Sequence, residues 1–460
     1  MSALSVLVVG GGFAGLSAAI RAIELGARVT LVEATRHGGG RARSFEDRTL
    51  GCTIDNGQHL MMGCYHHTRA FLRALDAEAL VDFQRDLTVS MVRPGGKPSR
   101  LRCPALPAPW HLGAGLLGMR GLGWRHKAVA LRAGLLLASE VRRPDDTETC
   151  DAWLRRMGQT AAVRAQFWEP LVWATLNEDP LVASAAMLLA VLERAFLGTR
   201  DDSTLGVPRR PLSELYVPRA LERIEAAGGS VHLGDPVRRL HVEDGRVAGV
   251  TTRGGRRFDA GRVIAALPPH ALLEILPDDW RVHPEFADVA RLTYAPIVNL
   301  WARVRRSPLD GQPFVGLVHS PIHWVFDRTR IEGRDDDEPV LSCTISGAYG
   351  FLRDSTKSLQ DLFVAEMRRF FPKVPVEVVA FKAIKEKRAT ISHAAGTYGL
   401  RPTVASPIDG LFLAGDWVRT GIPATIESAC QSGHEAAALS ARPAAGGWQD
   451  GPRPRIRAVP

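Results

Sequence analysis

The hydrophobic positions near the start of the chain predict a strand, a tight turn and a helix. A β-branched run from Val6 to Val9 predicts a buried strand, and it ends in Gly10-Gly11-Gly12. Apolar residues at helical spacing follow from Phe13 to Leu25. A second β-branched run, from Arg28 to Val32, ends at Glu33. This order of elements predicts a parallel βαβ unit.

Further along the chain, helical and strand-like patterns are mixed. Helical spacing recurs at 65–80, 153–197, 212–227 and 358–371. Strand-like runs occur at 87–92, 231–242, 246–252, 262–267, 297–304, 340–346 and 410–414. The runs at 231–242 and 246–252 predict a hairpin around Asp244-Gly245, which leads into a buried strand at 262–267. We expect that strand to return the chain to the first sheet.

The glycine turn has the spacing of a dinucleotide-binding loop. Gly10 makes the tight turn, Gly12 lets a pyrophosphate approach the backbone, and Gly15 lets helix and strand pack closely. The helix, with Ala14 in its first turn, directs N–H groups and a positive dipole end toward that pyrophosphate. Glu33 is placed to bind a ribose 2′-OH. The alternative interpretation is a glycine-rich loop in an ordinary βαβ unit.

A glycine-rich loop soon after Glu33 is a candidate for a second contact to the same ligand. It comprises Gly38, Gly39 and Gly40, and Arg41 follows it directly. Glycines allow close approach to a phosphate, and an arginine can bind a phosphate through two charge-assisted hydrogen bonds. The alternative is a flexible loop with solvated arginines. Its position just after the ribose-binding residue favours the cofactor.

A polar block at 53–63 is the main candidate for acid–base chemistry. It places Asp55, Asn56, Gln58 and His59 between apolar flanks. Carboxylate and imidazole groups are the usual proton donors and acceptors of enzymes. Asp55-Asn56-Gly57 is also compatible with a simple turn. We expect the block to lie near the cofactor or the substrate.

The last patterned stretch predicts a strand that ends in Gly415-Asp416 and a helix that begins near Ile426. A carboxylate at a strand end can accept hydrogen bonds from a polyol. The N-terminus of the helix can face the N1–C2=O edge of an isoalloxazine, which becomes anionic on two-electron reduction. Both features suit a flavin better than a nicotinamide. The alternative is a strand, loop and helix that only close the fold.

The predicted fold class is α/β, and 460 residues are enough for two domains. We expect a Rossmann-like FAD/NAD(P)-binding domain interleaved with an α+β substrate domain. The first is expected to comprise residues 1–75, 206–275 and 396–440, and the second residues 76–205 and 276–395. Residues 441–460 are rich in Pro, Gly and Arg and predict a disordered tail.

Composition is that of a folded soluble or peripheral protein, with 45% hydrophobic and 23% charged residues. The chain is basic, with 58 Lys and Arg against 49 Asp and Glu, but it has no aromatic-and-basic module, so no nucleic-acid partner is expected. The six cysteines lack zinc spacing, which predicts no metal site and reduced cysteines in the cytoplasm. The N-terminus lacks the basic region of a signal peptide.

Residues 112–141 combine apolar pieces, glycines and scattered cations. The apolar pieces are too short to span a bilayer. One interpretation is a helical segment that lies on the inner face of the cytoplasmic membrane, where its cations meet anionic headgroups. The other is a pair of core helices in the substrate domain. The sequence leaves both open.

Taken together, these motifs resemble the FAD-dependent amine oxidase and phytoene desaturase superfamily over residues 4–440. The resemblance rests on 8–16, 33, 39–42, 263–269 and 413–416. It implies FAD as the cofactor, with Gly10, Gly12 and Gly15 at the pyrophosphate. It further implies contacts of Glu33 with the adenosine ribose, of Arg41 with the phosphate side, of the Val237 backbone with the adenine, of Asp416 with the ribityl chain, and of the helix starting at Ile426 with the flavin.

Within the superfamily, residues 54–65 and 414–429 are similar to hydroxysqualene dehydroxylases, also called squalene-associated FAD-dependent desaturases. This resemblance implies reduction of hydroxysqualene, a C30 isoprenoid, to squalene for hopanoid synthesis in bacteria. The chemistry needs a hydride, a proton for the departing oxygen and a pocket that excludes water. Asp55 and His59 are the candidates for the catalytic acid.

Three other functions remain open from the sequence. A desaturase of the same fold would take hydride from a carotenoid precursor, and an amine oxidase would need an aromatic cage near the flavin. A non-catalytic flavin-binding partner of a terpenoid complex would bind FAD without turnover. Only one Gly-x-Gly-x-x-Gly unit is visible, so no NAD(P)H domain is expected and the electron donor is unknown.

Overall fold

The computed structural model describes residues 4–119, 123–138 and 143–442. At its centre is a five-stranded sheet in which all neighbouring strands are parallel. Its strands, in spatial order, are β10 (Ser230–Leu233), β2 (Arg28–Glu33), β1 (Ser5–Val9), β14 (Val263–Ala265) and β20 (Leu411–Leu413). Strand β1 occupies the middle because residues 6–9, at most 2% exposed, are covered on both faces. The predicted βαβ unit and the returning strand are therefore confirmed.

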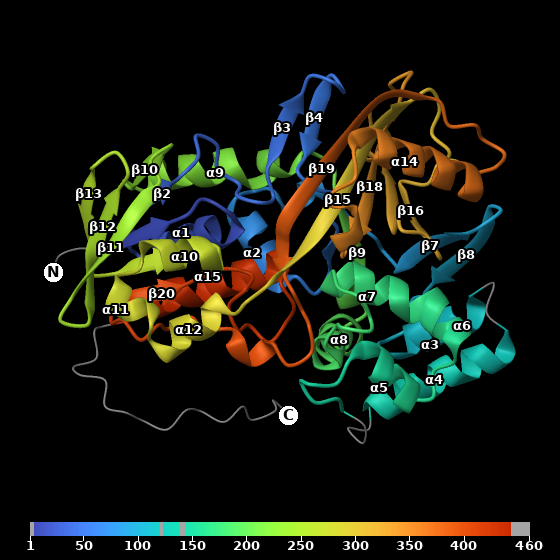
Figure 1. Ribbon diagram of the computed structural model, residues 1–460, viewed down its shortest axis with the longest axis horizontal. Helices are drawn as coiled ribbons and strands as arrows, with labels where there is room; N and C mark the ends of the chain where they lie inside the picture. Colours follow the sequence, from blue (N-terminus) through green and yellow to red (C-terminus); the bar gives the residue numbers. More distant parts are fainter. Residues whose placement is uncertain (1–3, 120–122, 139–142, 443–460) are drawn as a thin grey trace.

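Helices cover this parallel sheet and connect its strands. Helix α1 packs against α15, α9 and α2. These helices are α1 (Phe13–Glu24), α2 (His66–Ala74), α9 (Leu212–Ala226) and α15 (Ile426–Ser440). A further group follows β14 and comprises α10 (Pro269–Ile275), α11 (Asp278–Arg281) and α12 (Pro284–Ala290). Figure 1 shows these helices and the parallel sheet together on one side of the molecule.

The predicted strand at 231–242 is wrong, because the structure divides it between two sheets. Residues 231–233 belong to β10 of the parallel sheet. Gly234 then turns the chain with a φ of +76°, and Pro236 lacks an N–H group for sheet pairing. A separate antiparallel meander follows, formed by β11 (Val237–Glu243), β12 (Arg246–Thr252) and β13 (Arg257–Asp259).

A seven-stranded mixed sheet forms the other main layer. Its strands, in spatial order, are β19 (Val378–Ile391), β15 (Tyr294–Val304), β18 (Val340–Ser346), β17 (Trp324–Asp327), β16 (Phe314–Leu317), β7 (Thr88–Arg93) and β8 (Lys97–Arg102). Helices α13 (Arg328–Ile331) and α14 (Thr356–Phe370) accompany it. The sheet joins residues 88–102 to residues 294–391, which are two segments of the expected substrate domain. The division into domains itself stays a prediction.

Two small sheets connect the main layers. One pairs β3 (Ser44–Asp47) with β4 (Cys52–Asp55). The other consists of β5 (Met61–Met62), β9 (Leu205–Pro208) and β6 (Val81–Phe83). Strands β4 and β5 flank the polar block, so this block is held between two paired segments.

A helical block lies below the seven-stranded sheet in Figure 1. Its core contains Trp153 and Trp168, which are 1% and 4% exposed. The helices are α3 (Trp110–Gly118), α4 (Trp124–Ala138), α5 (Cys150–Arg156), α6 (Ala161–Val163), α7 (Glu169–Leu176) and α8 (Ala185–Leu192), with π-helical turns at Arg164–Trp168 and Glu193–Leu197. The expected helical region at 153–197 is thus divided, and one division falls at Asn177, whose φ is +51°.

Short 3-10 turns complete the structure, at Glu78–Leu80, Asp201–Ser203, Tyr349–Phe351 and Tyr398–Leu400. Within the described ranges, no helix has both the length and the apolar character needed to cross a membrane. The predicted disordered tail lies outside the described residues from 443 onward.

Candidate cofactor and active site

The glycine turn brings three backbone segments into contact at the carboxyl end of the parallel sheet. Gly10 has a φ of +110°, and a Cβ added there would lie 2.3 Å from the carbonyl oxygen of Ala266, just after β14. A Cβ on Gly15 would lie 1.8 Å from the Gly10 oxygen. Gly12 differs, because its nearest neighbour would be the Cα of Gly40 at 3.9 Å. The first and third glycines therefore serve packing, and the second borders open space.

Glu33 is held at the end of β2 by three hydrogen bonds. Its Oε2 accepts from the Gly11 N–H at 2.6 Å, and its Oε1 accepts from the N–H and hydroxyl of Thr35, each at 2.8 Å. The side chain is only 8% exposed. Glu33 thereby ties the glycine turn to β2 and presents a fixed carboxylate beside it, where a dinucleotide ribose is expected.

Tyr216 positions the loop opposite the glycine turn. Its ring, on α9, stacks on Phe13 with centroids 3.9 Å apart, and Phe13 is the first residue of α1. Its hydroxyl lies 2.9 Å from the Gly39 oxygen and 3.2 Å from the Ala42 oxygen and donates to these carbonyls. The start of α1 and the loop at 39–42 are thus fixed to one side chain. Sequence reasoning missed Tyr216, because nothing in its helical pattern distinguishes it from a core aromatic residue.

Arg41, in the loop opposite the glycine turn, forms an ion pair with Asp416, which follows β20. Nη2 of Arg41 lies 2.5 Å from Oδ1 of Asp416, and Nη1 donates to the carbonyl oxygen of Ala389 at 2.8 Å. Partial desolvation lowers the pKa of Arg41, but the charges of Asp416 and Glu386 and the hydrogen bond to Asp416 together raise it overall. The sequence assigned these residues to different parts of the cofactor, the phosphate side and the ribityl chain. The structure brings them together, and both assignments stay predictions.

The setting of Asp416 links it to the start of α15. Gly415 has a φ of +155°, and its N–H donates to the Ser432 hydroxyl at 2.9 Å. The Ser428 hydroxyl donates to the Asp416 carbonyl at 3.1 Å. Both serines belong to α15, whose N-terminus is capped by Thr425. Ile426 is therefore the first residue of this helix, as the sequence predicted, and the helix start is fixed beside Asp416.

Glu427, in the first turn of α15, was not singled out from the sequence. Its carboxylate is 1% exposed and accepts hydrogen bonds from the backbone N–H groups of His67 and Thr68 and from the Thr68 hydroxyl. These N–H groups belong to the first turn of α2, where a carboxylate compensates the helix dipole. Glu427 therefore links the first turns of α15 and α2, and hydrogen bonds stabilise its carboxylate.

Ala14 and Val237 are the two remaining candidates for contact with the cofactor. Ala14 is in the first turn of α1 and is 7% exposed. Val237 begins β11 and pairs with Thr252. Two residues before Val237, the Asp235 N–H donates to the Glu33 carbonyl at 3.2 Å. The chain at Val237 therefore passes close to the end of β2, and the predicted adenine contact stays a prediction.

The local chemistry at these positions fits FAD. The N-cap of α1 is Gly12, which has no side chain to occupy the first N–H groups of the helix. Among the described residues, the buried atoms Asp55 Oδ2 and Gln58 Oε1 have no hydrogen-bond partner. Buried polar atoms usually have one, so a bound molecule with donor groups would complete this region. The residues that would hold the group are those already described around Gly12, Glu33, Arg41 and Asp416.

The polar block packs directly against the loop that carries Arg41. The Asn56 N–H donates to the Arg43 carbonyl at 2.8 Å, and the Asn56 side-chain amide donates to the Arg41 carbonyl at 3.2 Å. Asp55 is 2% exposed, and its Oδ1 accepts from the Ser44 hydroxyl at 2.6 Å and from the Leu212 N–H at 2.8 Å. One oxygen of Asp55 therefore holds the start of α9.

His59 is the better placed of the two acid candidates. Its Nδ1 lies 2.7 Å from the Gly57 carbonyl oxygen, so Nδ1 carries the proton and Nε2 is the free acceptor. Burial lowers the pKa of His59 below its ordinary value, and the charge of Asp55 and the Gly57 carbonyl oppose this shift. The imidazole is neutral at neutral pH. It must first gain a proton before it can donate one from Nε2, and the catalytic roles of both residues stay predictions.

His393 is a positioning residue that sequence reasoning also missed. It follows β19, it is 1% exposed, and its Nδ1 donates to the Leu176 carbonyl at 2.7 Å. Its Nε2 accepts from the Ala424 N–H at 2.8 Å, two residues before α15. Burial lowers the pKa of His393 to about 3, so the ring stays neutral. A neutral imidazole thus connects the helical block to the start of α15.

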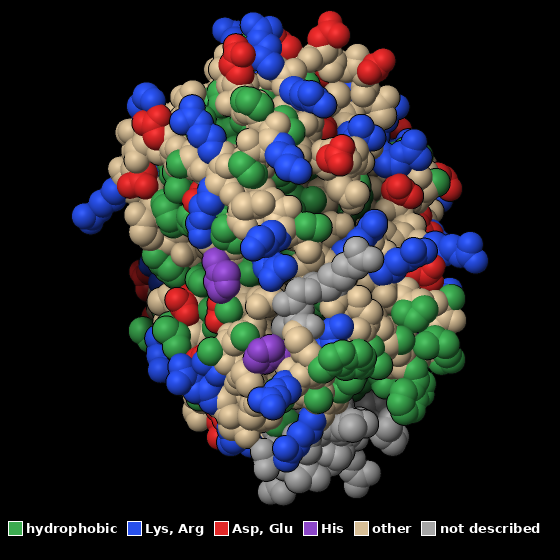
Figure 2. Space-filling view, turned by 90° about the vertical axis from the view of Figure 1, so that its right-hand side faces the viewer, with side chains coloured by type: hydrophobic (Ala, Val, Ile, Leu, Met, Phe, Trp, Pro, Cys, Tyr) green, Lys and Arg blue, Asp and Glu red, His purple; other side chains and the backbone are tan. Residues whose placement is uncertain are grey.

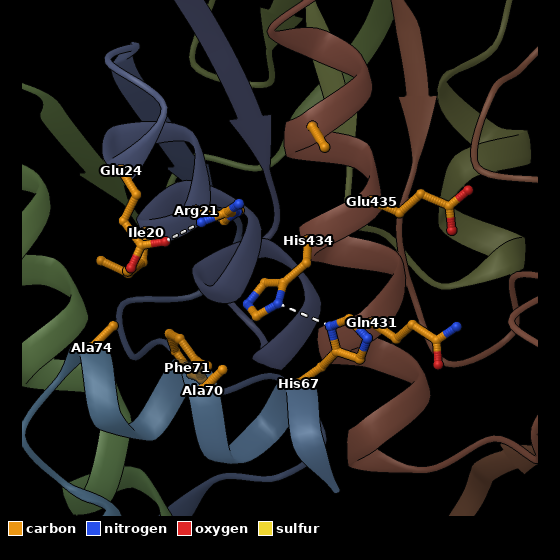
Figure 3. Close-up of a pocket in the computed structure, with 11 residues that line it drawn as sticks. Ile20, Arg21, Glu24, His67, Ala70, Phe71, Ala74, Gln431, His434 and Glu435 are labelled. Carbon is orange, nitrogen blue, oxygen red and sulfur yellow. Dashed lines mark hydrogen bonds and ion pairs between the residues drawn. The ribbon is translucent and has the colours of Figure 1, made fainter.

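A separate cleft of about 450 Å³ lies between α1, α2 and α15 (Figure 3). His67 and His434 point toward each other in it, with their Nδ1 atoms 3.1 Å apart, and burial lowers the pKa of His434 to about 4. The cleft is lined by later turns of α1 and α15, from Ile20 and Gln431 onward, and by α2 from His67 onward. Its lining does not include the glycine turn, Glu33, Arg41 or Asp416, so it is separate from the candidate cofactor site.

Fold and site together define an FAD-dependent oxidoreductase. The family model described as flavin containing amine oxidoreductase matches residues 13–439, and the chain belongs to this family. Over 437 residues, the chain is 27% identical to the hydroxysqualene dehydroxylase of Zymomonas mobilis subsp. mobilis, covering 94% of this chain and 98% of that protein. It is 26% identical over 451 residues to the 15-cis-phytoene desaturase of Synechococcus elongatus, with 94% of each chain covered.

Solved structures show the same fold. An oxidoreductase from Methanosarcina mazei superposes with a TM-score of 0.73 at 18% identity, covering 94% of this chain and 99% of that one. The cyclohexylamine oxidase of Brevibacterium oxydans superposes with a TM-score of 0.70 at 18% identity, covering 95% and 99%. These structures confirm the predicted α/β fold class, and membership of the flavin-containing family confirms the predicted FAD cofactor.

We predict that Gly12→Ala and Gly15→Ala affect different properties. An added Cβ on Gly12 meets open space in the protein but would occupy the path of the pyrophosphate. It should lower FAD affinity roughly 10- to 100-fold while changing apoprotein stability by less than about 1 kcal/mol. An added Cβ on Gly15 meets backbone and should destabilise the apoprotein by more than about 3 kcal/mol. FAD titration measures the first effect, and urea unfolding of the apoproteins measures the second. Equal FAD affinity of Gly12→Ala and wild type would contradict the predicted role of Gly12.

We predict that acid destabilises the protein partly through His393. The folded pKa is lowered to about 3, so below the ordinary value of 6.5 the unfolded state binds a proton that the folded state does not. Stability is therefore lost as pH falls through this window, by roughly 2 kcal/mol at pH 5 from this group. Urea unfolding at pH 5 to 7 should show a shallower loss for His393→Gln than for wild type. The exposed His37 supplies the control substitution, and an unchanged slope in His393→Gln would refute the assignment.

Proposed function

We propose that the protein catalyses the FAD-dependent reductive dehydroxylation of hydroxysqualene to squalene. One observation carries the proposal: the segment at 54–65, which resembles the hydroxysqualene dehydroxylases, packs through Asn56 against the loop at 41–43. Relatives with that name support it, because three of them match 94% to 95% of this chain at 27% to 28% identity. The products would serve squalene and hopanoid synthesis.

The reaction replaces an allylic C–OH bond by C–H and releases water. FAD, when bound and reduced, supplies the hydride equivalent. The protein must deliver a proton to the departing oxygen and keep water from the allylic cation. We assign the proton to His59, from Nε2 of the imidazolium. Asp55 favours that charged form, because its negative charge raises the pKa of His59 against the effect of burial.

An apolar cluster beside His59 supports a hydrocarbon substrate. Leu60, the next residue, packs with Phe314, Phe326 and Trp324 from β16 and β17. Phe314 and Phe326 are 5% and 3% exposed, and Leu60 and Trp324 are half-buried. Such side chains can surround an isoprenoid chain and exclude water. We propose that the half-buried Leu60 and Trp324 border the substrate and that the cluster behind them keeps water from the allylic cation.

A phytoene-type desaturase is the second candidate, because 15-cis-phytoene desaturases also match 94% of this chain. It would run hydride transfer from substrate to flavin. An amine oxidase is less well supported. The aromatic residue that follows Asp416, Trp417, is 1% exposed and donates its Nε1–H to the Leu267 carbonyl at 2.9 Å, so it is a core residue and offers no face to a substrate amine.

We predict that hydroxysqualene reoxidises the photoreduced holoenzyme under anaerobic conditions, with squalene formed in equal amount to flavin. The hydride and the proton both end in the product, so no oxygen is needed. Stopped-flow absorbance follows the flavin, and extraction with gas chromatography identifies the hydrocarbon. The control mixes the oxidised holoenzyme with phytoene, and the flavin should stay oxidised.

A desaturase and a non-catalytic flavin-binding partner give different outcomes in this pair of experiments. Flavin reduction by phytoene, with hydroxysqualene inert, would replace the proposal by desaturation. No reaction with either substrate, in protein that retains FAD, would favour a non-catalytic flavin-binding partner. Either outcome overturns the proposed dehydroxylation.

We predict that the single-turnover rate with hydroxysqualene rises as pH falls from 8 to 6. The pKa of His59 is lowered below its ordinary value, so the imidazole is mostly neutral at pH 8 and its imidazolium fraction grows as pH falls. His59→Gln should abolish this rise and lower the rate roughly 10²- to 10⁴-fold while FAD stays bound. Asp55→Asn keeps an acceptor for Leu212 and should shift the rise to lower pH.

His434→Gln is the matched control, because this histidine also has a lowered pKa but lines the separate cleft. It should leave the rate and its pH dependence unchanged. A His59→Gln protein with the wild-type rate and pH profile would exclude His59 as the acid. If Asp55→Asn alone removes activity without a shift of the pH profile, Asp55 is the donor.

A further inference from the structure

We propose that an exposed apolar patch on α3 and α4 docks the protein on an anionic lipid bilayer. The patch consists of Leu106, Trp110, Leu117 and Trp124, and we call it the tryptophan patch. These side chains are 42%, 67%, 41% and 74% exposed. The proposal does not depend on which substrate the protein uses. Figure 2 shows the face of the molecule that carries α3 and α4, with hydrophobic side chains gathered at its lower right.

The tryptophan patch is a concentration of large apolar groups, whereas single exposed leucines are common. Its four members lie within nineteen residues of sequence, from 106 to 124. The other tryptophans of the described ranges are buried or half-buried. Trp110 and Leu117 are seven residues apart on α3, which places them on the same face of the helix. A cluster of exposed large apolar side chains favours a site of association over isolated surface residues.

The patch is attached to a well-packed body. Helix α3 packs against α4 and β8. On the inner side, Leu116, Met119 and Ala130 are at most 8% exposed and belong to the core of the helical block. Lys127 joins the outer parts, because its Nζ donates to the Leu117 carbonyl at 2.6 Å and lies 5.1 Å from the centre of the Trp124 ring. The exposed side chains are therefore held in place by a folded support.

The stretch of sequence that carries the patch has charge of one sign. No Asp or Glu occurs between Asp86 and Glu140. The same stretch contains eight basic residues: Arg93, Lys97, Arg100, Arg102, Arg120, Arg125, Lys127 and Arg132. Arg125 and Arg132 are exposed on α4. Arg120 lies outside the described residues. A basic surface of this kind complements the negative potential of anionic headgroups.

Tryptophan next to cations favours a lipid surface over other partners. The indole ring is amphipathic and settles at the level of the headgroups, while arginine and lysine reach the phosphates. The exposed Pro107 and Pro109 beside Trp110 add further apolar surface without an N–H group to desolvate. The two interpretations of residues 112–141 therefore apply to different faces: the inner face is core, and the outer face is the docking surface.

The test is co-sedimentation of the purified holoenzyme with vesicles of equal parts phosphatidylglycerol and phosphatidylcholine. Wild type should bind, and binding should weaken as salt increases. Trp110→Ser with Trp124→Ser should lower the partition coefficient by about tenfold for each tryptophan. Arg125→Gln with Arg132→Gln should lower it by about fivefold for each cation on anionic vesicles and leave the weak binding to pure phosphatidylcholine unchanged.

Val282→Ser is the matched control, because Val282 is 79% exposed but lies between α11 and α12, away from the patch. It should bind vesicles like wild type. Retained FAD absorbance and an unchanged melting temperature show that the variants are folded. Equal vesicle binding of the double tryptophan variant and wild type overturns the proposal. So does a change from dimer to monomer in that variant without lipid, because the patch would then join two copies of this chain.

Discussion

The contact between Phe13 and Tyr216 is the constraint on which the cofactor site depends. It fixes the start of α1 to α9, and the Tyr216 hydroxyl then fixes the carbonyls of Gly39 and Ala42. The distance between the glycine turn and the loop at 39–42 is thereby set by one rigid aromatic side chain. A flexible loop would have to lose conformational entropy on binding a pyrophosphate. Here that ordering is already present in the fold.

The parallel sheet supplies the second part of the site. The carboxyl ends of neighbouring parallel strands meet at one edge, so Gly10 after β1, Glu33 at the end of β2 and Asp416 after β20 come together although they are far apart in sequence. Arg41 adds a positive charge at this edge and pairs with Asp416. Hydrogen bonds from Ser428 and Ser432 then tie the last strand to α15. The two ends of the chain thus build one site.

The sequence predicted the local part of this arrangement and the returning strand at 262–267, but it missed several long-range contacts. The βαβ unit was recognisable because its glycines, helix and second strand are neighbours in the chain. Tyr216 and His393 act on partners 177 and 217 residues away, and nothing in their own surroundings indicates this. The prediction of one continuous strand at 231–242 was wrong for a related reason. Alternation within a run does not reveal that Gly234 changes the direction of the chain and moves the next residues to another sheet.

The helical segment at 110–138 was ambiguous because a helix has two faces and hydrophobic spacing alone does not say what covers each one. The structure settles the inner face, where Leu116 and Ala130 enter the core. The outer face keeps Trp110 and Trp124 in solvent, where large apolar side chains lower the free energy only if another surface covers them. A C30 hydrocarbon dissolves in lipid and hardly in water, so an enzyme that binds it gains from docking on the bilayer. The proposed docking surface and the proposed substrate are therefore consistent with one physical property, the low solubility of long isoprenoids in water.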